Sequence, residues 1–365
     1  MRIALLGNAA ALHTRRWARG LAAAGATVRV FSLEDPAADA SFAAERGVEA
    51  PLDVVRLPAP DWPAALRYPA ARAAAARALD AFAPDVIEAH FVPNYGLLGV
   101  LVGRGPLVVH AWGSDLLRSP ARSALHAARA RFVLARADLV VVDAEALAVA
   151  ARALGAPSSR LVVAPWGADL ARFTFGPAVL VPHVVSLRQL EPLYDVATLI
   201  EALPVVHAAV PELRVTIAGD GPEAAALAAR AQARGVEGIV RFVGRVPHAA
   251  LPALLASAAV TVSCALSDST SIALLEGMAA GATPIVTDLP GNRAWVEDRV
   301  HGRLVPPGDA PHLAGALIET LLDPEFRGAA RMAARGRIEE RGDFAAVTRA
   351  ALERHAGLAT RGVAA

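Results

Sequence analysis

The chain alternates short apolar segments with longer helical segments, and this alternation occurs twice. In the first half, apolar segments that predict β-strands occupy residues 2–6, 27–32, 86–89, 107–111, 139–142 and 161–164. Helical patterns between them occupy residues 12–24, 63–82 and 121–135. The alternation begins again after residues 173–177, with predicted strands at residues 181–187, 214–218, 240–243, 259–263 and 283–286. Such alternation favours parallel sheets covered by helices on both faces, so the sequence predicts an α/β protein with two doubly wound, Rossmann-like domains.

The predicted domains cover residues 1–176 and 177–345, and residues 346–365 are predicted as a C-terminal helix. A chain of 365 residues with 55% apolar residues can fill two hydrophobic cores. Ligands of doubly wound sheets bind beyond the carboxyl ends of the strands. The polar motifs of this chain lie at or just after predicted strand ends, so we expect the functional site in a cleft between the two domains.

The composition excludes several classes of chemistry. The chain has no lysine, so all 36 basic residues are arginine. Walker P-loops, Schiff-base enzymes and pyridoxal enzymes all need a lysine, which rules out these activities. Asp-x-Asp pairs and cysteine or histidine clusters at zinc spacing are also missing from the sequence. The sequence therefore predicts neither a bound metal nor a cofactor.

Targeting signals are not evident. The first apolar run stops at Gly7 and lacks the pattern of a signal peptide, and no apolar run approaches the roughly 20 residues of a membrane span. The one cysteine, Cys264, lies in an apolar predicted strand and is expected to be buried. We expect a cytoplasmic protein whose membrane contact, if any, is peripheral at the inner membrane face.

The first domain is mildly basic, with 19 arginines against 15 acidic residues in residues 1–176. Five of these arginines gather in one predicted helical stretch with apolar neighbours: Arg118, Arg122, Arg129, Arg131 and Arg136. The stretch either attracts an anionic or lipid-linked acceptor, or is an ordinary solvated helix face.

Residues 267–281 combine two acidic side chains with a helix start. A hydroxyl-rich turn follows the predicted strand, and a helix is predicted from about Ile272 to Ala280. Its N-terminus would offer unpaired backbone N–H groups to an anionic diphosphate. Asp268 and Glu276 are about two helical turns apart, so they can accept hydrogen bonds from different parts of one elongated ligand. Alternatively, Asp268 or Ser269 only caps the helix and Glu276 is solvated.

Further motifs accompany this segment along the chain. They occupy residues 7–8, 13–17, 84–90, 112–115 and 165–169 in the first half and residues 186–195, 217–222, 240–246, 287–293 and 302–309 in the second. Together they resemble glycosyltransferase family 4, the glycosyl transferases of group 1. The resemblance implies the two-domain GT-B fold with a central cleft, a retaining mechanism, and a last helix that crosses back to the first domain.

The resemblance places most donor contacts in the second domain. It implies that Arg188 stabilises the diphosphate, that Asp268 contacts the sugar, and that Glu276 binds the ribose hydroxyls. Other implied donor contacts are Gly7, Gly219, Gly221, Gly244, Arg245, Val246, Ser269, Thr270, Ser271 and Ile272. The chain departs from the family because it has Asp268 where Glu is usual, and residues 192–195 lack the usual Lys. Either Arg188 with backbone donors, or a second arginine such as Arg245, would then neutralise the diphosphate.

The resemblance places the acceptor in the first domain, near His13, His90, Trp112, Asp115 and Trp166. Family members carry a His where this chain has Trp112. His110 lies two residues earlier, on the same side of the predicted strand. It is either a catalytic residue that partly replaces the missing His or an ordinary core histidine.

The resemblance thus implies a hexosyltransferase-like enzyme. It would move a sugar from a UDP- or GDP-linked donor to a hydroxyl group of a glycan, a lipid-linked sugar or a small molecule, with no nucleic-acid partner. One alternative is a nucleotide-sugar 2-epimerase of the same fold. Another is a non-catalytic protein that binds sugar nucleotides, because the usual Lys and His are missing. A dinucleotide-dependent oxidoreductase is disfavoured, since residues 7–11 lack the G-x-G-x-x-G turn.

Overall fold

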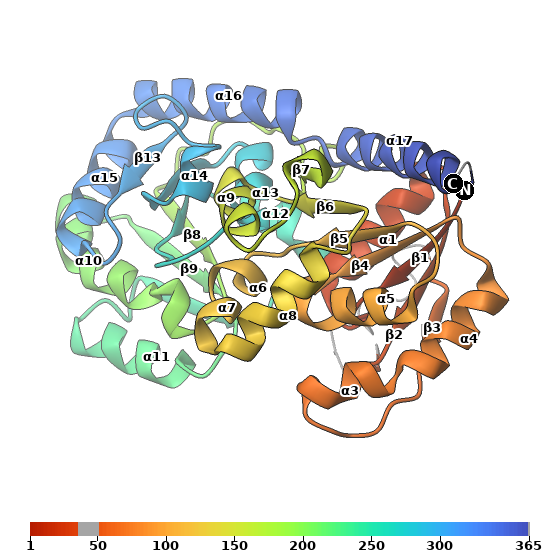
Figure 1. The fold of residues 1–365 in the computed structure, drawn as a ribbon. Coiled ribbons are helices and arrows are strands. Elements are labelled where there is room, and N and C mark those ends of the chain that lie inside the picture. Colours follow the sequence, from red (N-terminus) through yellow and green to blue (C-terminus); the bar gives the residue numbers. More distant parts are fainter. Residues whose placement is uncertain (36–50, 364–365) are drawn as a thin grey trace. The chain divides into compact units, whose positions relative to one another are not determined.

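The structure is a computed structural model that describes residues 1–35 and 51–363. It divides into two compact units. The first comprises Met1–Pro165 together with Phe344–Ala365, and the second comprises Trp166–Asp343. The C-terminal helix α17 (Phe344–Val363) therefore belongs to the first unit (Figure 1).

The first unit contains a seven-stranded parallel sheet in the order β3-β2-β1-β4-β5-β6-β7. Its strands are β1 (Arg2–Leu6), β2 (Thr27–Ser32), β3 (Val54–Arg56), β4 (Val86–His90), β5 (Leu107–His110), β6 (Leu139–Val142) and β7 (Leu161–Val163). Besides α17, its helices include α1 (Leu12–Ala23), α3 (Ala64–Ala70), α4 (Arg72–Phe82), α5 (Leu97–Val102), α6 (Ser114–Leu117), α7 (Ser119–Arg122), α8 (Ala124–Leu134) and α9 (Glu145–Ala153). A π-helical segment, η2 (Phe91–Gly96), follows β4 directly.

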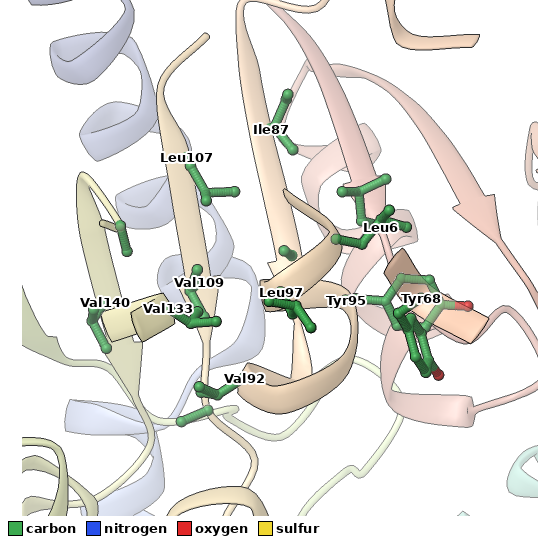
Figure 2. Packing of buried hydrophobic residues seen from close by; sticks show 14 of the residues in the cluster. Leu6, Tyr68, Ile87, Val92, Tyr95, Leu97, Leu107, Val109, Val133 and Val140 are labelled. Carbon is green, nitrogen blue, oxygen red and sulfur yellow. The ribbon is translucent and has the colours of Figure 1, made fainter. Parts of the chain in front are cut away.

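Apolar side chains fill both faces of this sheet. On one face, Ile87, Leu107, Val109 and Val140 lie with Val133 of α8 in a buried cluster (Figure 2). On the other face, α17 approaches α1 closely. A Cβ atom placed on Gly20 would lie 2.6 Å from the side chain of Thr348 and 2.7 Å from that of Phe344. Glycine at this position thus allows the last helix to pack against the first one.

The second unit contains a six-stranded parallel sheet in the order β10-β9-β8-β11-β12-β13. Its strands are β8 (His183–Leu187), β9 (Arg214–Ala218), β10 (Val240–Gly244), β11 (Val260–Ser263), β12 (Thr283–Thr287) and β13 (Arg303–Val305). Its helices include α10 (Val196–Ala209), α11 (Ala224–Ala233), α12 (Leu251–Ala256), α13 (Ile272–Ala280), α14 (Pro290–Arg293), α15 (Ala310–Leu322) and α16 (Pro324–Arg341). Two parallel sheets with interleaved helices confirm the predicted fold class.

The observed elements correct the prediction in several places. The helix predicted over residues 63–82 is two helices, α3 and α4, which meet at Ala71. The helix predicted over residues 121–135 is interrupted at Ser123, whose hydroxyl caps α8 by accepting a hydrogen bond from the His126 backbone N–H at 3.3 Å. Two edge strands of three residues each, β3 and β13, were not predicted.

The division between the units also differs from the predicted boundary at Gly176. Phe173 is fully buried in an apolar cluster of the second unit, and Ala168 forms a parallel bridge with Asp343. The second unit therefore begins at Trp166, and the last helix begins at Phe344 rather than at residue 346.

Cys264 is buried as predicted, and burial raises the pKa of its thiol to about 12. Within residues 1–35 and 51–363, no helix has the length and apolar composition that crossing a membrane would require.

Candidate functional site

Three predicted donor residues come together at the start of α13 in the second unit. The guanidinium of Arg188, just after β8, donates from Nη2 to Oδ2 of Asp268 at 2.7 Å and from Nη1 to Oγ of Ser271 at 2.5 Å. The Arg188 and Asp268 side chains are only 9% and 19% exposed. Arg188 Nε is buried and has no hydrogen-bond partner among the described residues. The two hydrogen bonds hold the guanidinium in one orientation and use two of its five N–H groups.

Tyr194 lies in the segment where members of the resembled family usually carry a lysine, and its ring contacts Arg188. Residues Pro192–Tyr194 form a short 3-10 turn, and the Tyr194 ring lies 4.1 Å from the Arg188 guanidinium, measured to the ring centroid. Stacking of this kind stabilises a cation over an aromatic face. The turn therefore supports Arg188 instead of adding a second positive charge.

The loop before α13 has a fixed backbone. Ser271, not Asp268 or Ser269, caps the helix, and its hydroxyl accepts from the Leu274 N–H at 3.4 Å. Ser269, Thr270 and Ser271 are buried, whereas Ile272 is half-buried. A Cβ atom on Gly291 would lie 1.7 Å from the Ser269 carbonyl oxygen, so α14 packs directly against this loop. The first N–H groups of α13 are thereby held in place where a diphosphate would bind.

The predicted donor glycines mainly shape the Arg188 loop. A Cβ atom on Gly219 would lie 1.9 Å from the carbonyl oxygen of Arg188, and one on Gly221 would lie 2.4 Å from that of Leu190. Gly244, at the end of β10, accepts a hydrogen bond from the Gly219 N–H at 2.9 Å. Gly219 and Gly221 allow the segments after β8 and β9 to pack closely together.

The other predicted donor residues follow β10 or lie in the first unit. Arg245 is exposed and Val246 is half-buried, directly after β10. Gly7 belongs to the first unit, where a Cβ atom would crowd the side chains of Leu5 and Thr14 at 2.9 and 3.0 Å.

Glu276 is buried, which contradicts the alternative that it is solvated. Its Oε1 lies 2.9 Å from Nε2 of His248, and Nδ1 of the same imidazole lies 2.7 Å from Nη1 of Arg172. Glu276 and His248 are 2% and 8% exposed. Sequence reasoning missed His248 and Arg172, because each lies far from Glu276 in the chain and in no recognisable motif.

In the first unit, a second buried carboxylate gathers three histidines. Glu88 of β4 and His90 point to the same side of the strand, and His110 of β5 pairs with His90 in the register of the sheet. Oε1 of Glu88 lies 2.7 Å from Nε2 of His110 and 3.2 Å from Nε2 of His90, and it also accepts from the indole N–H of Trp17. Oε2 lies 3.6 Å from Nε2 of His355 in α17. We call Glu88, His90, His110, His355 and Trp17 the Glu88 cluster.

Burial and hydrogen bonding set the charges of the Glu88 cluster. Burial alone would raise the pKa of Glu88, but His110, His355 and His90 together hold it well below its usual range. Burial lowers the pKa of His90 to about 4 and also lowers the pKa of His355. Glu88 is therefore ionised at neutral pH, and His90 is neutral.

Among the described residues, Glu88, His110 and His355 form a group that could hold a metal ion. No spacing in the sequence indicated this group, because the three residues come from three separate elements. However, Nε2 of His110 and Oε1 of Glu88 are 2.7 Å apart, whereas two ligands of a tetrahedral zinc ion would be about 3.4 Å apart given bonds of about 2.0–2.1 Å. Hydrogen bonding accounts for the observed distance better than shared coordination does.

The predicted acceptor residues differ in how deeply they are buried. Trp112 is half-buried, and its ring centroid lies 5.2 Å from those of His13 and His90. His13 is exposed, but His90 and His110 are only 1% and 3% exposed. The expectation that His90 faces an open site is therefore wrong, and His110 has the burial of a core histidine. The His90 ring packs against the half-buried indole, and the His110 ring packs against His90 and Trp17.

Two predicted acceptor contacts are corrected. Asp115 is fully buried, and its carboxylate accepts from the backbone N–H groups of Trp112 at 2.9 Å and Val92 at 3.1 Å. Burial raises the pKa of Asp115 to about 6 despite these hydrogen bonds. Asp115 thus fixes the Trp112 loop instead of meeting a ligand. Trp166 is buried and begins the second unit, not the first.

Comparison with known families and proteins agrees with this architecture. Residues 176–337 match the model of the glycosyl transferases group 1, and residues 8–167 match that of the glycosyl transferase 4-like domain. The chain is 36% identical over 176 residues to a phosphatidyl-myo-inositol mannosyltransferase of Mycolicibacterium smegmatis, covering 46% of this chain and 45% of that protein. It is 31% identical over 191 residues to a glycogen synthase of Mycobacterium tuberculosis, covering 50% of this chain and 45% of that protein. These alignments span less than half of each curated relative.

Solved structures share the fold over nearly the whole chain. Anabaena HepE in complex with UDP superposes with a TM-score of 0.81 and 20% identity, covering 98% of this chain and 100% of that one. A sucrose-phosphate synthase of Thermosynechococcus elongatus also gives a TM-score of 0.81 at 20% identity, covering 98% of this chain and 99% of that one. At this identity the likeness establishes the fold, which is that of GT-B glycosyltransferases.

Proposed function

Because the chain belongs to the group 1 glycosyltransferases, we propose that it is an enzyme that transfers a sugar from a nucleotide diphosphate sugar to a hydroxyl acceptor. The observation that carries the proposal is the arrangement of Arg188 at the start of α13. Asp268 and Ser271 fix a guanidinium whose Nε is buried and has no hydrogen-bond partner in the part of the chain that the structure describes, and this guanidinium lies beside a capped helix N-terminus. Both features favour a diphosphate, which needs several donors and positive charge.

The residues of this site divide the work of binding and catalysis. Arg188 and the first N–H groups of α13 neutralise the charge that grows on the diphosphate as the bond between the sugar C1 and the phosphate oxygen breaks. Asp268, already oriented by Arg188, accepts a hydrogen bond from a sugar hydroxyl. Glu276 accepts hydrogen bonds from the ribose. A UDP-linked donor is supported by Anabaena HepE, which has been solved in complex with UDP-glucose, and a GDP-linked donor is the alternative.

The proposed reaction retains the configuration of the sugar, as the family resemblance implies. The acceptor oxygen forms its bond to C1 on the face from which the diphosphate departs, and the acceptor proton passes to a diphosphate oxygen. No separate protein base is needed, so catalysis rests on positioning and charge stabilisation. Since Arg188 supplies positive charge, we also propose that the reaction needs no metal.

The proposed acceptor surface is the exposed part of Trp112 in the first unit. The backbone N–H of Trp112 donates to Asp115, and the indole lies against the rings of His13 and His90. An indole held in this way offers a rigid apolar face on which a sugar ring can stack. Similarity to phosphatidyl-myo-inositol mannosyltransferases supports a lipid-linked acceptor, with glycans and small molecules as alternatives.

A lipid-linked acceptor fits an apolar and basic surface on the first unit. Trp62, Leu66 and Leu125 are 53%, 58% and 62% exposed, and Arg129 of α8 donates to the Ala65 carbonyl at 3.1 Å, which brings α8 next to α3. Arg118 and Arg122 are exposed on the preceding segment. Apolar side chains beside arginines favour peripheral contact with an anionic membrane, and we place this contact on the cytoplasmic face. Sedimentation with anionic but not zwitterionic vesicles would support it, and a lack of binding even at low salt would refute it.

The central experiment is incubation with UDP- and GDP-hexoses plus candidate acceptors. We expect release of nucleotide diphosphate together with a product of retained anomeric configuration, detected by NMR. Arg188→Ala should lower kcat by about 10²- to 10³-fold, whereas the surface variant Arg230→Ala, which removes only an exposed ion pair with Glu201, should behave as wild type. Conversion of the sugar nucleotide without acceptor would instead indicate a 2-epimerase. Tight binding without turnover would indicate a non-catalytic protein.

A further inference from the structure

The side chains of Arg172, His248 and Glu276 form a linear hydrogen-bonded chain in the second unit. Arg172 Nη1 lies 2.7 Å from His248 Nδ1, and His248 Nε2 lies 2.9 Å from Glu276 Oε1. The histidine is the first residue of a short 3-10 turn, His248–Ala250, and its ring packs edge-on against Phe173 with centroids 5.8 Å apart. Three segments far apart in the sequence therefore meet at one carboxylate.

The chemistry of arginine fixes the tautomer of this histidine. A guanidinium has only donors, so Nδ1 of His248 must accept. A neutral imidazole that accepts at one nitrogen carries its proton on the other. His248 consequently donates from Nε2 to Glu276. Because the ring is 8% exposed and the carboxylate 2% exposed, water has little access to compete for this hydrogen bond.

A fixed donor matters because the carboxylate of glutamate otherwise rotates freely. The terminal torsion of a Glu side chain has broad, shallow minima, so the orientation of the Glu276 carboxylate depends on the groups that bond to it. The hydrogen bond from His248 fixes one of its oxygens. A carboxylate has about four acceptor positions on its two oxygens, so this bond is compatible with hydrogen bonds from the hydroxyls of a diol.

We propose that His248, held by Arg172, is a specificity-determining positioning residue that orients Glu276 toward the vicinal hydroxyls of a ribose, so that the site selects ribonucleoside diphosphates over deoxyribonucleoside diphosphates. This inference rests on the proposed donor-binding function. Sites built to bond a hydroxyl discriminate strongly against analogues that lack it, because a buried polar group is then left unpaired.

The test measures binding of UDP, 2′-deoxy-UDP, GDP and 2′-deoxy-GDP by calorimetry. For wild-type protein we expect at least one ribonucleotide to bind about tenfold more tightly than its deoxy counterpart, the value of one hydrogen bond to a charged group. Glu276→Gln should remove most of this preference. His248→Phe keeps the ring volume and the contact with Phe173 but removes both nitrogens, and it should reduce the preference nearly as much. His248→Gln retains an N–H donor and should preserve most of it.

The preference is a ratio of two affinities measured on the same variant, so partial loss of folded protein cancels from it. If Glu276→Gln removes the preference but His248→Phe retains it, His248 only packs against its neighbours and the inference is wrong. If Glu276→Gln itself leaves the preference unchanged, or if wild-type protein binds none of the four nucleotides, the proposed donor site fails and the inference fails with it. Loss of preference in Arg172→Met with normal thermal stability would support the tautomer argument, and an unchanged preference would overturn it.

Discussion

Each unit of the molecule buries a glutamate against histidine, but the two arrangements differ in what the histidines contact. In the first unit, Oε1 of Glu88 receives hydrogen bonds from Trp17 and His90 and lies 2.7 Å from His110, and His355 faces Oε2. In the second unit, His248 lies 2.9 Å from Oε1 of Glu276, and its other ring nitrogen lies 2.7 Å from Arg172. Three histidines converge on the first carboxylate, whereas at the second a histidine bridges a carboxylate and a guanidinium.

This difference separates a structural centre from a binding group. The residues around Glu88 come from α1, β4, β5 and α17, so the carboxylate ties the last helix of the chain to the sheet of the first unit. Substitutions at a buried charge with several donors are strongly destabilising, because the removal of one partner leaves the others uncompensated. Glu276 lies on α13, the helix whose start also holds Ser271 beside Arg188. The predictions below test this contrast.

The largest effect is expected from Glu88→Ala. Removing the carboxylate leaves buried imidazoles and the Trp17 indole without their common acceptor, and it should lower the free energy of unfolding by about 3–5 kcal/mol. Urea denaturation followed by tryptophan fluorescence would measure it. Glu353→Ala, an exposed acidic position on the same helix as His355, serves as the matched control and should be close to neutral. A loss below about 1 kcal/mol for Glu88→Ala would mean that the cluster is not a structural centre.

The second prediction concerns acid. Burial lowers the pKa of His90 to about 4 and lowers that of His355, while histidine neighbours hold the pKa of Glu88 well below its usual range. Between pH 6.5 and about 4 the unfolded chain binds a proton at His90 that the folded chain does not, so stability should fall as the pH falls through this window, by about 3 kcal/mol for His90 alone.

Hydrogen exchange of peptides from β4 and β5, compared between pH 7 and pH 5, would detect this loss in the first unit. His90→Gln keeps a donor for Glu88 but cannot titrate, and it should flatten the dependence on pH. Equal protection at both pH values in the wild type would contradict the assigned charge states.

The fold could be predicted from the sequence more completely than these clusters could. Long strands such as β2 and β9 carry apolar runs that identify them directly, and the segment from Asp268 to Glu276 carries a helix start that can be recognised locally. Arg188, Asp268 and Ser271 could be predicted to meet because all follow the ends of neighbouring parallel strands, β8 and β11. His248, Arg172 and His355 could not, because their roles depend on packing between distant elements that no local pattern encodes. The prediction that Asp115 contacts the acceptor was wrong for the same reason, since an acidic side chain after a strand can equally well hold a loop through backbone hydrogen bonds.

A smaller effect is expected from Trp112→Ala. Trp112 is half-buried and its loop is held by Asp115, so the variant should remove an apolar wall without disturbing Glu276. We expect the KM of the acceptor to rise about tenfold, the scale of one lost aromatic contact, with little change in the KM of the donor. Glu276→Gln should show the reverse pattern. If Trp112→Ala raises the KM of the donor instead, the division of acceptor and donor contacts between the two units is wrong.

Chelation of metal ions comes last in this order, because we expect it to have no effect. The Nε2 atom of His110 and Oε1 of Glu88 are separated by 2.7 Å, a hydrogen-bond distance that is shorter than the about 3.4 Å between two ligands of tetrahedral zinc. In the second unit, Arg188 and the N-terminus of α13 supply the positive charge that a metal would otherwise bring to the diphosphate. Purified protein should therefore contain less than one zinc ion per chain, and EDTA should change neither its melting temperature nor its turnover.

Two different results would contradict this prediction, one for each unit. Stoichiometric zinc that is lost in Glu88→Gln, with a lower melting temperature after chelation, would make Glu88 a metal ligand. An unchanged melting temperature with turnover lost in EDTA and restored by Mg²⁺ would show that a metal, and not Arg188 alone, neutralises the leaving diphosphate.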